Sequence, residues 1–538
     1  MLTNESGKKL CNFELHVECV IKKVDICKGG SKSYVHVRLE FDDDYSETAV
    51  DIPMEEVQKS HWWEREVKCR LNPEIPEAKF RGYLANAVKK AMKDAPEKTI
   101  YQLSHTGMSV IKGEAIFCTG LEAIRPPAST ISESEVEILQ VEKHLDIDAN
   151  LSEAEAVAEM FDCISLSPDA GRVILAHKLI YLMYQAYVEV GKRPNVCVFL
   201  YGETGTNKTT FSAFLTQMYN RDGGIASPLR LNASIAAAVE ILSESYDDTI
   251  VLDDLFPAGS KSIRRKQEET FLEVARYIAD GTMPARMKGN KLLEGLPKCG
   301  VVFTGEYIVG SGSDAARMLP VEMTRPDAGK FKDFQDRPLM VSAFYYFYIR
   351  WLVENYSEIV PLLKAWVCEY QKLDFGIHRR LQETHFFFNT AYALLLQYCC
   401  EKHFLSEKDA IQLQISFRDL LTALVRQQDE KVSPKALKKV ESMSYWETIQ
   451  ALYKDGQLSI AQGIETFDKE RDDGVIHNKS LYLRGDKLSV YFPQADISDI
   501  VDELESKCVL ELGKKNRTKQ ISALGGMRFY VIPLVYLS

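Results

Sequence analysis

The chain lacks the long apolar runs that would anchor a protein in a membrane. Its opening residues, MLTNESGKKL, contain no apolar stretch typical of a signal peptide, and no later run reaches membrane-spanning length. The twelve cysteines are scattered and form no C-x-x-C pair, which argues against a metal cage or a disulfide scaffold. Internal repeats and low-complexity tracts are missing too. We therefore expect a folded, cytoplasmic protein whose thiols are free.

The chain also lacks an excess of positive charge. Its formal net charge is −11, which excludes a protein that coats nucleic acid through general basicity. Any contact with DNA must come from local basic patches. The 538 residues, of which 46% are hydrophobic and 27% charged, are too many for one hydrophobic core and have an ordinary globular composition.

A glycine-rich loop between two apolar segments is the most informative part of the sequence. Residues 196–200 are typical of a buried strand, and the helical run TTFSAFLTQMY follows the loop GETGTNK. This is the layout of the phosphate-binding P-loop, G-x-x-x-x-G-K-[ST], except that Asn207 replaces the second glycine. Asn tolerates positive φ better than most residues, so we expect the loop to form. The predicted nucleotide-binding residues are Gly202, Glu203, Thr204, Gly205, Thr206, Asn207, Lys208, Thr209 and Thr210.

The chemistry of this loop predicts partners farther along the chain. Lys208 would supply a positive charge at the β- and γ-phosphates, and the Thr209 hydroxyl would hold Mg²⁺. The strand-like residues 249–252 end in Asp253 and Asp254. NTPases of this class place such a strand beside the P-loop strand, so we predict that Asp253 reaches Mg²⁺ and that Asp254 polarises the attacking water. The alternative is that both acids only cap a strand.

Two further segments indicate a ring-forming type of NTPase. The apolar run KCGVVFTGE ends in Thr304 and Glu306, where ring ATPases carry a sensor of the γ-phosphate, and Glu306 could help Asp254 to orient water. Arg317 precedes another strand-like run and could project into a neighbouring subunit's nucleotide site. Arg379 and Arg380 begin a helix, from which either could reach back to the phosphates. The alternatives are an ion pair with a surface acid for Arg317 and a solvated helix start for the other two.

Two basic segments are candidate DNA contacts. The stretch RYIADGTMPARMKGNKLLEG reads as a helix followed by a hairpin, and hairpins at this point of ring helicases grip the phosphodiester backbone. The loop LGKKNRTKQ lies between two strand-like runs, as does the basic wing of a winged-helix module. Each could instead be an ordinary solvated turn. The cations are Arg286, Lys288 and Lys291 in the hairpin, and Lys514, Lys515, Arg517 and Lys519 in the loop.

The four motifs GETGTNKTT, IVLDDL, VVFTGE and AARMLPVE, in this order and spacing, resemble AAA+ ATPases of bacterial mobile elements and prophages. That family includes the self-loading, MCM-like replicative helicases of staphylococcal cassette elements and pathogenicity islands. The resemblance covers residues 100–430, and only Asn207 departs from the usual P-loop. It implies a hexameric ring that binds ATP and Mg²⁺ between subunits and moves 3′-to-5′ on single-stranded or forked DNA.

Hydrophobic patterning predicts an α/β protein in which strands and helices alternate, giving a parallel sheet with crossover helices. A helix is expected near residues 77–93, and the pair Trp62–Trp63 is expected in a core. In the last region we expect a helix, a strand, a helix and a β pair formed by residues 508–515 and 527–537. The expected regions are an N-terminal α+β domain (1–125), a linker with a helical segment (126–193), the AAA+ core (194–334), a helical lid (335–435) and a winged-helix-like domain (436–538).

These features predict an ATP-dependent DNA helicase or translocase. Two alternatives remain open at this point. One is a DNA-independent switch or remodelling ATPase, for example of a defence system, which would need no cationic hairpin. The other is a DNA-binding initiator whose ATP site controls assembly. Stimulation of ATP turnover by single-stranded DNA distinguishes the three.

Overall fold

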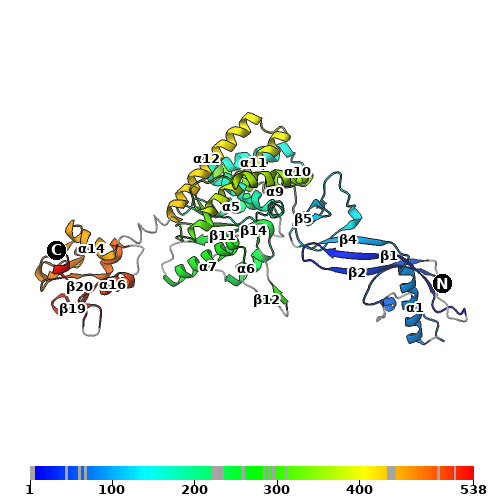
Figure 1. Cartoon of the computed structure of the whole chain (residues 1–538), viewed down its shortest axis with the longest axis horizontal. Coiled ribbons are helices and arrows are strands. Elements are labelled where there is room, and N and C mark those ends of the chain that lie inside the picture. The colour runs from blue at the N-terminus through cyan, green and yellow to red at the C-terminus, as the bar shows by residue number, and fades with distance from the viewer. Residues whose placement is uncertain are drawn as a thin grey trace. The chain divides into compact units, whose positions relative to one another are not determined.

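The computed structural model shown in Figure 1 divides into two compact units, residues 1–432 and 433–538. Only the backbone is described for Leu229, Arg230, Asp254, Lys261, Ser262, Ser489 and the hairpin residues 286–288 and 291–293. The residues described are 7–42, 46–57, 62–65, 69–74, 76–141, 143–219, 229–230, 235–255, 261–282, 286–288, 291–293, 297–310, 312–432, 444–492, 497–513 and 516–537.

The first unit begins with a five-stranded sheet in the order β3-β2-β1-β4-β8. Its core contains Trp62 and Trp63, as expected, and the predicted helix near residues 77–93 is confirmed as α1. The last strand, β8, begins at Val136, so this sheet extends past the expected domain boundary at residue 125. The bounds are β1 Phe13–Asp25, β2 Ser31–Phe41, β3 Glu47–Pro53, α1 Glu77–Met92, β4 Glu97–Leu103 and β8 Val136–Ile138. A small sheet consists of β5 Gly107–Ile111, β6 Glu114–Cys118 and β7 Ala123–Ile124.

A second, entirely parallel sheet forms the centre of this unit, in the order β10-β11-β14-β9-β15. The predicted parallel sheet with crossover helices is therefore confirmed. One detail of the expectation is wrong, because β14 lies between the P-loop strand β9 and the acid-bearing strand β11. The strands are β9 Cys197–Tyr201, β10 Leu229–Arg230, β11 Tyr246–Leu255, β14 Lys298–Gly305 and β15 Met318–Glu322. The helices between them are α5 Lys208–Thr216, α6 Ile235–Ser243 and α7 Lys261–Asp280.

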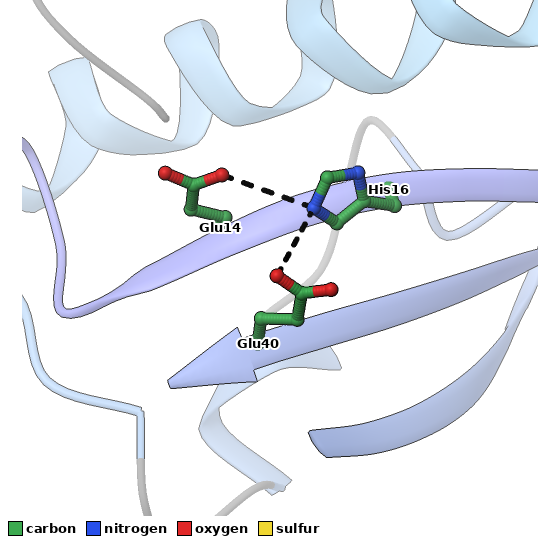
Figure 2. Close-up of side chains that lie close together, drawn as sticks. All are labelled: Glu14, His16 and Glu40. Carbon is green, nitrogen blue, oxygen red and sulfur yellow. Dashed lines mark ion pairs between the residues drawn. The ribbon is translucent and has the colours of Figure 1, made fainter. Parts of the chain in front are cut away.

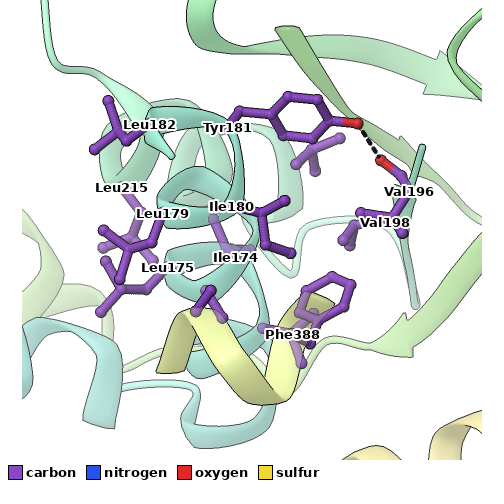
Figure 3. Close-up of a cluster of buried hydrophobic side chains, with 14 of the residues drawn as sticks. Ile174, Leu175, Leu179, Ile180, Tyr181, Leu182, Val196, Val198, Leu215 and Phe388 are labelled. Carbon is purple, nitrogen blue, oxygen red and sulfur yellow. Dashed lines mark hydrogen bonds between the residues drawn. The ribbon is translucent and has the colours of Figure 1, made fainter. Parts of the chain in front are cut away.

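Helices cover this sheet, which is why the middle parts of its strands are apolar. Helix α3 is buried on nearly all sides, and its Tyr181 hydroxyl donates a 2.9 Å hydrogen bond to the Val196 carbonyl just before β9 (Figure 3). Phe388, from α11, packs into the same core. The predicted helical segments before β9 are α2 Glu153–Ser165, α3 Pro168–Leu182 and α4 Tyr184–Glu189.

The region after the parallel sheet is helical, as predicted, and its aromatic stripes are largely buried in the core. The helices are α8 Ala328–Gln335, α9 Leu339–Glu354, α10 Tyr356–Tyr370, α11 Arg379–Glu401 and α12 Glu407–Val432. None of the helices in the described part of the chain is long and apolar enough to cross a lipid bilayer. All twelve cysteines are free.

The second unit is a small α/β module with its own core. Its sheet has the order β16-β17-β18-β20-β19. The expected terminal β pair is partly wrong, since its first strand begins at Lys519 and the described residues 508–513 form no strand. The elements are α14 Tyr445–Lys454, β16 Ile460–Ala461, β17 Gly474–His477, β18 Ser480–Leu483, α15 Gly485–Tyr491, α16 Ile497–Ser506, β19 Lys519–Ile521 and β20 Met527–Pro533.

A buried polar joint connects the small N-terminal sheet to the start of β11. The carboxylate of Asp247 accepts a 2.5 Å hydrogen bond from the Met108 amide. Gly107 allows this approach, because a Cβ there would lie 2.5 Å from Asp247 Oδ2. Tyr246, which precedes Asp247 on β11, stacks on His105 with ring centroids 3.6 Å apart. Nothing in the sequence marked this joint, since its partners are 139 residues apart.

This joint predicts a pH dependence of stability. Burial raises the pKa of Asp247 to about 7, although the Met108 amide, His105, Lys298 and Lys178 all act to lower it. The folded state therefore favours the protonated acid. Its contribution is full below the unfolded pKa near 4 and is lost as the pH rises through 7, by at most about 1.4 kcal/mol per pH unit.

We therefore expect Asp247→Asn to remove this loss, because Asn keeps an acceptor for the Met108 amide and tolerates the positive φ of 48° at this position. Thermal melting between pH 5 and 8 should show the wild type losing stability relative to the variant up to about pH 7, with no further change above it. The control is Asp336→Asn, whose carboxylate is 61% exposed. Parallel melting curves for wild type and Asp247→Asn would contradict the assignment.

Candidate functional site

The P-loop segment (residues 202–209) adopts the backbone that the sequence requires. Asn207 is the N-cap of α5 and lies in the left-handed region at φ 60°, which explains why Asn can replace glycine here. Gly202 and Gly205 also have positive φ, 155° and 81°. The loop thus leaves the carboxyl end of β9 and turns directly into the first turn of a helix, where backbone N–H groups and the helix dipole favour an anion.

Lys208 is folded back into this loop. Its Nζ donates hydrogen bonds of 2.9 and 2.8 Å to the carbonyls of Gly202 and Glu203, and one of 3.2 Å to the Thr206 hydroxyl. Burial lowers the pKa of Lys208, while the negative charges of Glu306 and Asp253 act in the opposite direction. The loop therefore holds a buried cation among neutral acceptors, which a phosphate could replace.

Three oxygen-bearing side chains converge beside the loop. The Thr209 hydroxyl donates to Asp253 Oδ1, and the Thr304 hydroxyl donates to the same oxygen at 2.6 Å. The two hydroxyls are 3.1 Å apart. Carboxylate and hydroxyl oxygens are donors that suit Mg²⁺, so this set fits the ion that the sequence predicts. Thr304 belongs to the group because β14 lies between β9 and β11.

The P-loop segment faces an open cleft of about 610 Å³. Glu306 crosses to the loop and accepts a 2.5 Å hydrogen bond from the Thr204 hydroxyl. Glu322, at the carboxyl end of β15, also lines the cleft, and only its place at a strand end could have pointed to it in the sequence. The lining residues are Tyr201, Gly202, Glu203, Thr204, Glu306 and Glu322. The backbone of Asp254 lies in β11, but its side chain is outside the description, so its role as base stays a prediction.

The candidate arginines Arg317 and Arg380 lie at the amino ends of the strands of the parallel sheet, whereas the P-loop follows a carboxyl end. Arg317 immediately precedes β15, whose first residue pairs with Cys197 at the start of β9, whereas the P-loop follows the end of β9. Its guanidinium contacts Asp280 at 3.2 Å and Asp314 at 3.2 Å. Arg380 contacts the same Asp280 at 2.7 Å. The prediction that Arg380 reaches back to the phosphates from the start of its helix stays a prediction, and in this chain the guanidinium is paired with Asp280.

Arg379 differs from these two arginines. Its side chain is 87% exposed and lies 3.9 Å from Glu383, one turn along the same helix. This is the solvated helix start that the sequence left open as an alternative.

The candidate DNA contacts are only partly described. The predicted hairpin is confirmed in its backbone as β12 Arg286–Lys288 and β13 Lys291–Leu293, with Lys288 opposite Lys291. It extends away from the parallel sheet (Figure 1). In the second unit, Arg517 forms ion pairs with two acids of α16, Asp502 at 2.5 Å and Glu505 at 2.9 Å. Lys514 and Lys515 lie outside the described residues.

A group of potential metal ligands lies on the N-terminal sheet, remote in sequence from the P-loop. His16 Nε2 is 3.9 Å from Glu14 and 3.7 Å from Glu40 (Figure 2). All three side chains are at least a third exposed, and Glu40 also accepts a hydrogen bond from Arg38. Arg38 in turn pairs with further acids of the same face. This group is part of a solvated ladder of charges across β1, β2 and β3.

Comparisons with known proteins give structural neighbours only. No protein-family model and no curated protein matches the chain. The solved structure described as "SCCmec type IV Cch - active helicase" aligns with 97% of this chain and 94% of that chain, at 12% identity and a TM-score of 0.49. The apo structure of the NrS-1 C-terminal region aligns with 78% of this chain and 90% of that chain, at 10% identity and a TM-score of 0.25. Likenesses at this level establish neither a family nor a function.

Proposed function

We propose that the chain is an AAA+ ATPase that couples hydrolysis of Mg·ATP to movement along single-stranded DNA, as a replicative-type helicase. The observation that carries the ATPase part is the convergence of Thr209, Asp253 and Thr304 beside a P-loop that already holds Lys208. Mg²⁺ bound there would neutralise charge on the transferring phosphoryl group. Lys208 would exchange its carbonyl partners for phosphate oxygens, and Glu306 together with Asp254 would orient the attacking water.

The separation of the two edges of the sheet supports assembly into a ring. The proposed phosphate-binding groups lie at the carboxyl ends of the strands, and Arg317 and Arg380 lie at the amino ends. A single subunit therefore cannot bring these arginines to its own nucleotide. In a head-to-tail arrangement, the amino ends of one subunit's strands would meet the carboxyl ends of the next subunit's strands, and a rotation that closes would give a ring in which every site is complete. We propose such a ring, with ATP between subunits, and take the number of six subunits from the family that the sequence resembles.

ATP turnover measured with and without single-stranded DNA tests this function. We expect DNA to stimulate turnover, since the proposed motor should release its product faster when it is engaged. Turnover that is equal in both conditions would indicate a switch or remodelling ATPase. Binding of DNA and ATP with negligible turnover would indicate an initiator. The hairpin, the helical region that we assign as a lid and the second unit that we assign as a winged-helix-like domain are parts of the same proposal.

The hairpin makes the DNA part of the proposal testable. Residues that face each other across an antiparallel pair lie on the same face, so Lys288 and Lys291 occupy one face of β12 and β13. We expect the double change Lys288→Ala and Lys291→Ala to reduce DNA-stimulated turnover and unwinding and to spare turnover without DNA. The slope of log affinity against log salt should shrink by about 1.4, because two phosphate contacts on a single strand are lost.

The control for this change is Lys402→Ala with Lys408→Ala, which removes two exposed lysines from the helical region. It should leave unwinding and the salt slope unchanged. Wild-type unwinding of a forked DNA by the hairpin variant would show that these cations do not grip the strand.

A further inference from the structure

The two arginines at the amino edge of the parallel sheet share one carboxylate. Asp280, the last residue of α7, accepts from Arg380 Nη2 at 2.7 Å and from Arg317 Nη2 at 3.2 Å. These residues come from α7, from the turn before β15 and from the start of α11. The same turn is held from a fourth segment, because Gln428 of α12 donates a 2.6 Å hydrogen bond to the Ala315 carbonyl. The turn is thus held at Ala315, and Arg317 itself is held through its guanidinium.

Each arginine keeps a buried donor that has no partner among the described residues. These atoms are Nε of Arg317 and Nη1 of Arg380. A buried donor without an acceptor costs free energy of about 1–3 kcal/mol. Asp280 therefore orients the two guanidinium groups without saturating them, because one buried N–H of each has no partner among the described residues.

The position of Asp280 is itself tightly determined. A carboxylate at the C-terminus of a helix faces the negative end of the helix dipole, so α7 gains nothing from an acid there. Gly281 ends the helix at φ 67°, and the Arg193 guanidinium occupies the space where a Cβ would lie, 2.2 Å away. Burial raises the pKa of Asp280, but the hydrogen bonds from Arg380 and Arg317 outweigh it and hold that pKa below its ordinary value. The acid is charged at neutral pH, and the two arginines are its counter-ions.

We infer that Asp280 is a positioning residue for hydrolysis at the neighbouring subunit's site, where it aligns Arg317 and Arg380 as a pair toward that neighbour's phosphates. This inference rests on the proposed function, in which the arginines act between subunits. Without the carboxylate, two like charges would repel each other and lose their common orientation. Asp280 does not touch the nucleotide, and it acts through the arginines.

The test is steady-state ATP turnover by the full chain carrying Asp280→Asn. The amide keeps the shape but removes the charge, and its NH₂ group cannot accept from a guanidinium. We expect kcat to fall about tenfold to a hundredfold, as for other residues that orient a catalytic group, with KM for ATP unchanged. Mixing this variant with Lys208→Ala should restore part of the activity, because some interfaces then join an intact P-loop to an intact arginine pair. A purely structural defect would not be rescued in this way.

The control is Glu269→Gln, which removes an exposed acid from the same helix and should leave turnover unchanged. Wild-type turnover by Asp280→Asn, or loss without rescue in the mixture, would overturn the inference. If Arg317→Ala were fully active as well, the proposed function itself would fail. The activity of Arg317→Ala therefore distinguishes failure of the inference about Asp280 from failure of the proposed function. Should Asp280→Asn not fold, Asp280→Glu applies the same test, because its longer side chain displaces both arginines. Unchanged turnover by that folded variant would equally overturn the inference.

Discussion

Replacing Lys208 by Ala should lower ATP turnover at least about a hundredfold and should remove most of the ATP binding. Lys208 is the cation that the P-loop segment holds in place, through the carbonyls of Gly202 and Glu203. Alanine leaves the β- and γ-phosphates without a fixed positive charge. Binding of a fluorescent ATP analogue and release of phosphate measure the two effects separately.

A companion variant separates binding from chemistry. Asp254→Asn should bind ATP normally but fail to hydrolyse it, if Asp254 is the base that activates water. Near-normal turnover by this variant would move the role to Glu306, which already reaches the loop through Thr204. A Lys208→Ala protein that kept both binding and turnover would show that the nucleotide does not bind at this loop.

Replacing Arg317 by Ala should leave ATP binding intact and lower turnover roughly a thousandfold, since an arginine supplied to a neighbouring site acts on the charge of the transition state. In the proposed ring the loss should be at the neighbour's site, because Arg317 lies at the amino ends of the strands, opposite its own P-loop. Turnover and ATP binding are measured on the same preparation. Thermal melting checks that loss of the contacts to Asp280 and Asp314 has not unfolded the chain.

A mixture of Arg317→Ala and Lys208→Ala proteins gives the decisive result. In a one-to-one ring assembled at random, about a quarter of the interfaces pair an intact P-loop with an intact arginine. Activity should therefore rise above that of either variant alone. Two folded, assembling proteins that showed no rescue would mean that Arg317 does not act between subunits, and its ion pairs with Asp280 and Asp314 would then be its whole role.

The amino-acid sequence by itself determined the local features. The P-loop, its left-handed Asn207, the following helix and the apolar strands are encoded by residues that are neighbours in the chain. Short-range patterning is enough for such elements, because hydrophobic periodicity and the conformational freedom of Gly and Asn act over a few residues. For the same reason the helices of residues 335–435 and the hairpin before β14 could be predicted from the sequence.

Only the tertiary structure decided which of these elements meet. The order of the strands placed β14 between β9 and β11 and so brought Thr304 to Asp253, whereas the sequence placed the acid strand directly beside the P-loop strand. It also separated Arg380 from its own P-loop and joined it to Arg317 through Asp280. The physical reason is that an ion pair or a strand neighbour depends on the packing of segments many residues apart, and local patterning does not specify that packing.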